Sequence, residues 1–261
     1  MVNRPLPGKV IRYKVNKHSL ELAANEDFPV TDLVTYELED GIATITLNNG
    51  KANALSQEVF KAFNAALDKA EADKAIVILT GQPGMFSGGY DLKEMQQGPK
   101  EAMALVKTGS TLTRRLAAFP LPVIAACSGH AIAKGAFILL SVDYRVGVEG
   151  SFKLGLNEVA IGMTMHHAGI EIARHRLAAP YFNRSVVNAE IFNPETAVVA
   201  GFLDETVVPE QLMERAKTVA TQFKQLNLRA HKQTKLKARA DYLALLDRCI
   251  EEDAAHFGLG G

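Results

Sequence analysis

Short apolar segments that alternate with amphipathic helical patterns restrict the fold of this 261-residue chain more than any other feature. Residues 75–80 and 122–127 are apolar runs typical of strands that are buried on both faces of a sheet. A helical pattern precedes each run, the first over residues 56–70 and the second over residues 100–118. Because parallel strands are joined by such crossovers, this order predicts an α/β fold.

Two shorter strands are expected ahead of the first helix. Residues 34–39 and 42–47 flank Asp40-Gly41, a dipeptide that favours a tight hairpin turn. Alternation in the second strand predicts that one face carries Ala43, Ile45 and Leu47. Ser56 has the side chain expected of an N-cap at the start of the helix that follows.

The second half of the chain is predicted to be mostly helical. We expect helices over residues 135–141, 193–201 and 209–226, and strands over residues 144–148 and 203–208. The final helix has an apolar stripe of Leu236, Ala240, Leu243, Leu246, Ile250, Ala254 and Phe257. This stripe fits packing on its own domain and packing on a neighbouring subunit equally well. The expected division is an N-terminal appendage over 1–30, a core over 31–205, and a helical oligomerisation region over 206–261.

Composition excludes several classes of function. Lys and Arg together number 29, as do Asp and Glu, and this balance argues against a nucleic-acid binder. No apolar run reaches the roughly 18 residues of a membrane span. Cys127 and Cys249 have no metal or redox spacing, and we predict reduced thiols in a cytoplasmic protein with no metal site. Residues 1–30 lack the apolar stretch of a secretory signal.

Three segments contain the residues best suited to chemistry. Residues 86–91 and 128–135 are glycine-bearing turns that can present backbone N–H groups to an oxyanion. Residues 155–162 place one carboxylate, Glu158, among apolar neighbours, where burial is expected to raise its pKa. A base opposite such N–H groups moves a proton alpha to a carbonyl. The order and spacing of the three segments therefore predict enolate chemistry.

These segments resemble the crotonase (enoyl-CoA hydratase/isomerase) superfamily, and the resemblance covers about residues 31–261. Five stretches carry it: residues 47–55, 86–95, 122–143, 155–162 and 197–204. The second and fourth are especially similar to Δ3,Δ2-enoyl-CoA isomerases of the mitochondrial type. The resemblance implies a crotonase/ClpP-like spiral of repeated β-β-α units with a C-terminal helical region. It also implies a homotrimer or a dimer of trimers.

The resemblance assigns roles to individual residues. The backbone N–H groups of Tyr90 and Lys134 are implied to polarise the thioester carbonyl of an acyl-CoA substrate, and Glu158 is implied to be the catalytic glutamate. The family usually has glycine at position 134, so a positive φ there would strain the lysine. Hydratases carry a second glutamate at the position of Phe137. Because one base suffices to move a double bond, the apolar residue favours an isomerase over a hydratase.

Further residues are implied to contact the substrate. Channel-lining positions by this resemblance are Lys51, Ala52, Gly88, Gly89, Asp91, Leu92, Lys93 and Gly135. A basic stretch over residues 224–239 either approaches the nucleotide end or forms a solvated helix face. His166 and His167 are expected at a helix entry, one of them buried and hydrogen-bonded, and His130 is expected in loop packing. No cofactor is expected, since CoA is part of the substrate.

Alternative functions stay open from the sequence. The same enolate chemistry serves an enoyl-CoA hydratase, a decarboxylase or a thioester hydrolase. A non-catalytic acyl-CoA-binding protein is a possibility from another class, which Glu158 disfavours and which Phe137 and Lys134 keep open. Neither a serine-hydrolase elbow nor a nucleotide-binding P-loop is present in the sequence.

Overall fold

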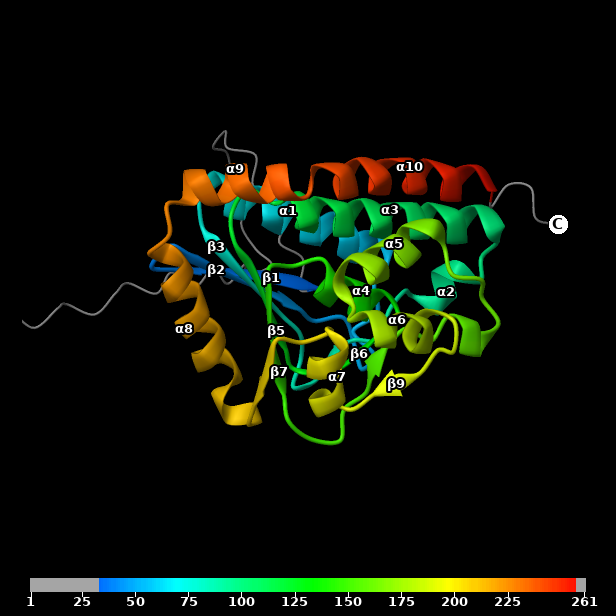
Figure 1. The fold of residues 1–261 in the computed structure, drawn as a ribbon, viewed down its shortest axis with the longest axis horizontal. Helices are drawn as coiled ribbons and strands as arrows, with labels where there is room; N and C mark the ends of the chain where they lie inside the picture. Colours follow the sequence, from blue (N-terminus) through cyan, green and yellow to red (C-terminus); the bar gives the residue numbers. More distant parts are fainter. Residues whose placement is uncertain (1–32, 257–261) are drawn as a thin grey trace, which may run out of the picture.

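The computed structural model describes residues 33–256, and the side chains of residues 33–255. The expected appendage over 1–30 and the last residue of the apolar stripe, Phe257, lie outside the described residues. Figure 1 shows strands crossing the centre of the molecule, with the long helices α3 and α10 side by side along one edge and α8 along another.

The larger of two sheets has six strands. They are β1 (Val34–Glu39), β2 (Ile42–Leu47), β3 (Ile76–Thr80), β5 (Val123–Cys127), β7 (Tyr144–Val148) and β10 (Glu205–Val207). Their order in space is β1-β2-β3-β5-β7-β10, in which β1 and β2 are antiparallel and every later pair is parallel. The predicted hairpin at Asp40-Gly41 is present, with Glu39 paired to Ile42, and the face of β2 that carries Ala43, Ile45 and Leu47 is the buried one.

The smaller sheet has four strands. They are β4 (Gly84–Ser87), β6 (Gly129–Ile132), β8 (Leu154–Gly155) and β9 (Ile191–Phe192), in the order β4-β6-β8-β9. The first three run parallel and β9 runs antiparallel to β8. After the β1-β2 hairpin and α1, the pairs β3-β4, β5-β6 and β7-β8 each contribute one strand to the large sheet and one to the small sheet, and helical segments follow each pair. This repeat confirms the predicted spiral of β-β-α units.

Helices cover both sheets and follow the predicted order. They are α1 (Gln57–Ala72), α2 (Leu92–Met95), α3 (Pro99–Ala118), α4 (Lys134–Leu140), α5 (His167–Arg176), α6 (Ala179–Val186), α7 (Pro194–Ala200), α8 (Leu212–Lys224), α9 (Leu228–Ala238) and α10 (Ala240–His256), with short 3-10 turns η1 (Val159–Ile161) and η2 (Pro209–Gln211). The predicted cap at α1 is present, since the Ser56 hydroxyl accepts a hydrogen bond of 3.1 Å from the Val59 N–H.

The large sheet has a separate apolar core on each face. On β3, Ile76 and Ile78 pack toward α8, whereas Val77 and Leu79 belong to the core shared with α1, α3 and α4. All five residues of this strand are buried, as predicted for a strand with helices on both sides. The sheet is therefore held rigidly between two layers, and it fixes where the small sheet lies.

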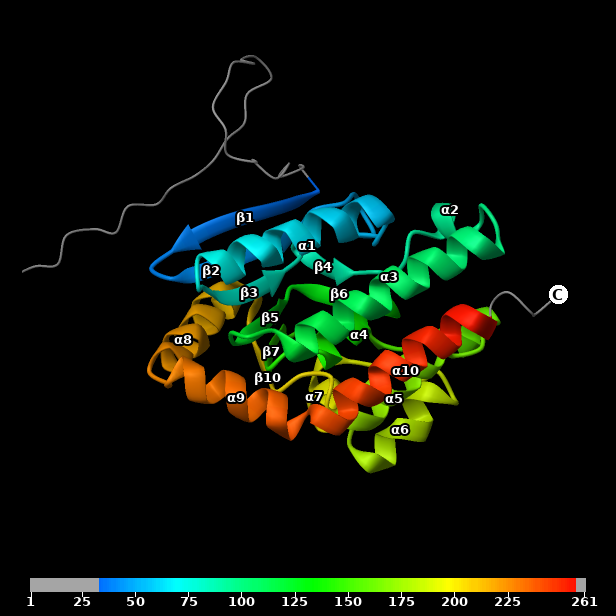
Figure 2. The same ribbon diagram turned by 90° about the horizontal axis from the view of Figure 1, so that it is seen from above.

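The last predicted helix is in fact two helices, because α9 ends at its C-cap, Arg239, before α10 begins. Figure 2 shows α9 and α10 meeting at a bend, with α10 lying along α3. Leu243, Leu246 and Ile250 are buried within this chain, in the seams that α10 forms with α3 and α5. Intrachain packing therefore accounts for these residues of the apolar stripe.

Two members of the basic stretch are structural. The Lys235 ammonium donates to the carbonyls of Phe119 and Leu121 and to the Asp143 carboxylate at 2.6 Å. Arg239 also contacts Asp143, at 3.0 Å. These two residues hold the α9–α10 bend against the end of α3 and are not free to meet a nucleotide.

The close approach of β4 and β6 gives a first prediction. A Cβ added at Gly129 would lie 2.0 Å from the backbone carbon of Gly84, so the small sheet cannot close in Gly129→Ala. We expect this variant to lose about 3 kcal/mol or more of unfolding free energy, measured by urea denaturation. Gly50→Ala is the control, because Gly50 has a φ of +63° with open space around it and should lose only about 1 kcal/mol. Equal losses would contradict the steric account.

Candidate active site

Three parallel strands of the small sheet end at one edge, and each is followed by a predicted site segment. Gly88–Tyr90 follows β4, Ala133–Lys134 follows β6, and Leu156–Glu158 follows β8. The Ala133 N–H donates to the Gly155 carbonyl at 2.9 Å, which continues the pairing beyond the last strand residues. Because the carboxyl ends of neighbouring parallel strands lie together, the fold brings these three distant segments to one place.

Two backbone N–H groups at this edge have no partner. Within residues 33–256, the N–H groups of Tyr90 and Lys134 have no hydrogen-bond acceptor. The turns that carry them are in contact, since a Cβ added at Gly89 would lie 3.4 Å from the Lys134 nitrogen. At Gly135 a Cβ would lie 2.4 Å from the Ser87 carbonyl oxygen, so only glycine permits this approach. The pair has the features of an oxyanion-binding site.

The anticipated strain at position 134 falls on its neighbour. Ala133 has a φ of +50° and a ψ of −120°, whereas Lys134 is not among the residues with positive φ and begins α4. The lysine substitution therefore imposes no backbone strain of its own. The unusual conformation of Ala133 turns the chain sharply from β6 into α4 and exposes the first helical N–H.

Glu158 is the buried carboxylate of the site. Its side chain follows β8, is 6% exposed, and its Oε2 has no hydrogen-bond partner in the described part of the chain. Burial raises the pKa of Glu158 to about 7, opposed by its own backbone N–H and by the positive charge of Lys134. A carboxylate with a pKa near neutrality both accepts and returns a proton at physiological pH.

The Lys134 side chain points into the protein interior. It is fully buried, and its ammonium donates to the Thr113 hydroxyl of α3 at 3.0 Å. The ammonium also lies 5.9 Å from the centre of the Tyr90 ring and 5.7 Å from that of Phe137. This burial rules out the phosphate contact that an exposed lysine at this turn would offer.

Apolar and neutral groups complete the surroundings. Phe137 is fully buried and meets the ring of His166 edge to face, with 5.5 Å between ring centres. His166 is the buried residue at the entry of α5, as predicted, but its Nε2 has no hydrogen-bond partner within residues 33–256, which corrects the expected hydrogen bond. Burial and the charges of Lys134 and His167 lower the pKa of His166 to about 3, so its ring is neutral at physiological pH.

The remaining predicted site residues lie around the turn Gly88–Tyr90, which follows β4. Lys51 and Ala52 are exposed, and the Ala52 carbonyl accepts a hydrogen bond of 2.8 Å from the Gly88 N–H. Asp91 caps α2 by accepting from the Lys93 N–H at 2.8 Å. Leu92 and Lys93 are exposed on α2. His130 accepts a hydrogen bond from the Lys153 N–H and packs on Phe152, as expected for a structural residue.

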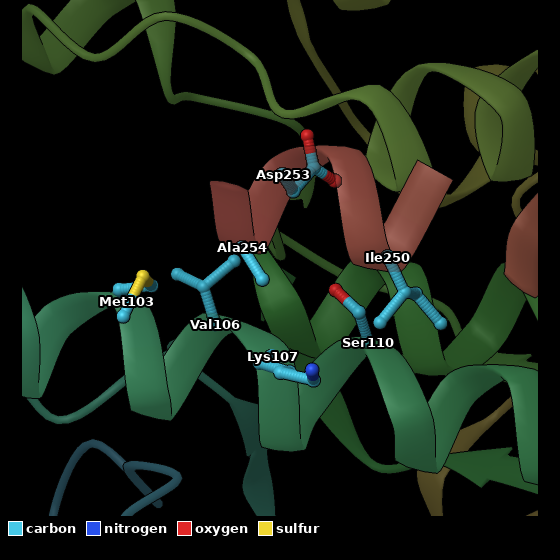
Figure 3. A pocket seen from close by; sticks show the side chains of 7 residues that line it. All are labelled: Met103, Val106, Lys107, Ser110, Ile250, Asp253 and Ala254. Atoms are coloured by element: carbon cyan, nitrogen blue, oxygen red, sulfur yellow. The ribbon is translucent and has the colours of Figure 1, made fainter. Parts of the chain in front are cut away.

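Two supporting residues are absent from the sequence prediction. Asn53 is buried and its side-chain amide donates to the carbonyls of Leu47 and Phe86, so it fastens the loop after β2 to β4. Asp253 of α10 accepts from the N–H groups of His167 and Ala168 and so holds the start of α5. Figure 3 shows Asp253 above a small pocket, lined also by Ser110 and Ile250, between α3 and α10. Asn53 has a φ of +48°, a conformation that asparagine tolerates better than most residues. An asparagine in a loop is the one feature of the sequence that is consistent with this conformation.

The described residues contain no helix long and apolar enough to cross a membrane. They also contain no group of three or more His, Cys, Asp or Glu side chains arranged to hold a metal ion. Cys127 and Cys249 are free, buried thiols.

Comparison with known proteins places this geometry in a family. The family model described as enoyl-CoA hydratase/isomerase matches residues 37–258. The chain belongs to this family. The protein is accordingly an enzyme of the enoyl-CoA hydratase/isomerase family.

Individual relatives are named as isomerases or as hydratases. The chain is 34% identical over 200 residues to the mitochondrial enoyl-CoA delta isomerase 1 of Rattus norvegicus, covering 73% of this chain and 68% of that protein. It superposes on an enoyl-CoA hydratase/isomerase family protein from Pseudomonas syringae with a TM-score of 0.87, 61% identity, and coverage of 88% and 100%. A probable enoyl-CoA hydratase from Mycobacterium tuberculosis gives a TM-score of 0.84, 42% identity, and coverage of 87% and 97%.

The raised pKa of Glu158 gives a second prediction, on stability. A carboxyl group whose pKa is raised in the folded state binds more protons folded than unfolded between its ordinary pKa of 4.5 and about 7. The carboxyl group therefore makes its full contribution to stability below pH 4.5, and this contribution is lost as the pH rises through the window. At pH 8, Glu158→Gln should be more stable than the wild type by about 3 kcal/mol, and the difference should vanish near pH 4.5. Urea unfolding at both pH values measures it. A less stable variant at pH 8 would contradict the buried carboxylate.

Proposed function

We propose that the protein is a Δ3,Δ2-enoyl-CoA isomerase that acts on unsaturated fatty acyl-CoA thioesters in β-oxidation. One observation carries the proposal: a single buried carboxylate, Glu158, shares one edge of the small sheet with two unpartnered N–H groups. In this assignment Glu158 is the catalytic base, and the N–H groups of Tyr90 and Lys134 bind the thioester oxygen.

The proposed reaction needs only these groups. Glu158 removes a proton from C2 of a 3-enoyl-CoA, and the electron pair of that C–H bond delocalises onto the thioester oxygen. The two N–H groups stabilise the resulting dienolate, and losing one such donor typically costs about 100- to 1000-fold in rate. The protonated Glu158 then returns the proton at C4, so that the double bond lies between C2 and C3. A pKa of about 7 suits both steps at neutral pH.

The apolar side chain of Phe137 supports isomerisation rather than hydration. Adding water calls for two carboxylates, one to activate the water and one to deliver a proton to carbon. Phe137 occupies the position where the resemblance places the second glutamate, and it is fully buried against His166. Asp253, another buried carboxylate, is held by two backbone N–H groups of α5. Glu158 is thus the carboxylate available to the reaction.

The names of the relatives divide between the two reactions. The rat relative is named as an isomerase, and a human protein titled mitochondrial delta3-delta2-enoyl-CoA isomerase superposes with a TM-score of 0.81 at 26% identity. A Bacillus subtilis protein that is 27% identical is named as a probable hydratase. The number of carboxylates in the site therefore supports the choice better than the names do.

The proposal extends to the substrate channel. The residues around the turns that follow β4 and β6 are assigned to binding of the CoA thioester, with no separate cofactor. They are Lys51, Ala52, Gly88, Gly89, Asp91, Leu92, Lys93 and Gly135. Exposed Lys93 at the end of such a channel meets a phosphate as a point charge. A homotrimer or a dimer of trimers in the cytoplasm remains part of the proposal.

Product analysis tests this function, and it constitutes a third prediction. Purified protein is given 3-cis-enoyl-CoA, 3-trans-enoyl-CoA and, separately, 2-trans-enoyl-CoA, and the products are separated by liquid chromatography. The first two should be converted to 2-trans-enoyl-CoA, while the last should not be hydrated. Glu158→Gln should lower kcat by about 100- to 10,000-fold, the usual contribution of a general base.

Matched controls separate the competing functions. Glu210→Gln changes an exposed carboxylate beside α8 and should leave kcat unchanged. Calorimetry with a saturated acyl-CoA should give the same Kd for Glu158→Gln and for the wild type. Hydration of the 2-trans substrate with Phe137 in place would refute the single-carboxylate argument. Tight acyl-CoA binding without any turnover would instead favour a binding protein.

A further inference from the structure

The Lys134 side chain is a buried cation for which the backbone role of this residue gives no reason. Its side chain is fully buried, whereas lysine is almost never buried without a compensating partner. No carboxylate of the described residues lies within 4 Å of its ammonium, and the one hydrogen bond seen is to the neutral Thr113 hydroxyl. An ammonium has three N–H donors, so this contact leaves most of its charge uncompensated locally.

The interior of the protein is shaped to admit this side chain. On α3, a Cβ added at Gly109 would lie 3.0 Å from Lys134 Cε and 2.6 Å from the Tyr90 hydroxyl oxygen. Glycine at this position therefore leaves a notch that the lysine tail and the tyrosine ring fill together. Thr113, one turn further along α3, holds the ammonium at the end of the notch. The arrangement fixes the position of the charge and does not simply tolerate it.

The titratable groups around this charge come from four elements. Glu158 follows β8, the Tyr90 phenol follows β4, and the His166 imidazole lies at the start of α5. Asp253 of α10 faces the Tyr90 phenol. Burial keeps the tyrosine protonated and the histidine neutral, since it raises the pKa of Tyr90 and lowers that of His166. The Asp253 carboxylate accepts hydrogen bonds from the N–H groups of His167 and Ala168 in α5. Glu158 is therefore the group whose ionisation can respond to the charge of Lys134.

The two side chains favour each other's charged forms. Burial lowers the pKa of Lys134 to about 7, and Glu158 opposes that change. Burial raises the pKa of Glu158 to about 7, and Lys134 opposes that change in turn. Without the lysine, burial would act on Glu158 with less opposition, and a larger fraction of the enzyme would carry a protonated, inactive base at neutral pH.

We propose that the Lys134 side chain is a positioning residue that acts through Glu158, its buried ammonium favouring the ionised form of the catalytic carboxylate. The inference rests on the proposed function for its catalytic consequence, but its electrostatic part concerns the free protein alone. Lys134 thus has two separate functions: its backbone N–H binds the thioester oxygen, and its ammonium keeps the base ready to accept the C2 proton.

A carboxyl titration of the free protein gives the fourth prediction. Glutamate labelled with ¹³C at the side-chain carboxyl is incorporated, and Glu158→Gln identifies the Glu158 resonance by its loss. In Lys134→Met, which keeps the backbone N–H and nearly the same volume, the titration midpoint of Glu158 should rise by about one pH unit. Lys153→Met removes an exposed lysine shortly before β8 and should leave the midpoint unchanged. A midpoint unmoved in Lys134→Met overturns the proposal.

A pH–rate profile supplies the catalytic readout. The acid limb of kcat/KM should move to higher pH in Lys134→Met, so that the loss of activity at pH 6 exceeds the loss at pH 9 by about tenfold. A loss that is equal at all pH values would indicate a structural role and overturn the proposal. Thr113→Val, which frees the ammonium without removing it, should shift the limb in the same direction by a smaller amount.

The two readouts distinguish the failure of this inference from failure of the proposed function. If the wild-type enzyme does not isomerise enoyl-CoA, the proposed reaction is wrong, yet the carboxyl titration still decides whether Lys134 acts on Glu158. Circular dichroism and the thermal unfolding midpoint of each variant establish that it is folded. If Lys134→Met does not fold, Thr113→Val decides the question, and an unmoved midpoint in that variant counts against the proposal.

Discussion

The parallel pairing of β4, β6 and β8 is the constraint on which the site depends. These strands are short, and their pairing is possible because glycines allow backbones to approach where any side chain would collide, as at Gly129 beside Gly84. Segments that are more than 20 residues apart in the chain therefore end at one edge. The candidate active site is a property of the small sheet, and the large sheet with its two helical layers holds that sheet in place.

Burial of charge is the second principle of the site, and it carries a cost in stability. Glu158 and Lys134 are both removed from water, which disfavours the charged form of each, and neither has a close ion-pair partner. Their mutual attraction offsets part of this cost. The same low dielectric that makes the charges expensive makes each of them act strongly on the other and on a reacting thioester.

Much of the fold could be predicted because its signals are local. The hairpin at Asp40-Gly41, the Ser56 cap and the strand that includes Val77 follow from turn chemistry, capping and periodicity. The direction of the Lys134 side chain could not be predicted, because it depends on a notch at Gly109 in a distant helix. For the same reason the contact of α10 with the start of α5, the break in the last helix, and the shift of backbone strain from position 134 to its neighbour are visible only in three dimensions.

The central claim is that two backbone N–H groups polarise the thioester carbonyl of a bound acyl-CoA. Infrared difference spectroscopy with a saturated acyl-CoA that carries ¹³C at the thioester carbonyl measures this directly. The account predicts that the carbonyl stretch of the bound ligand moves to clearly lower wavenumber than in water. A stretch unchanged from that in water, under conditions where calorimetry shows the ligand to be bound, would contradict it.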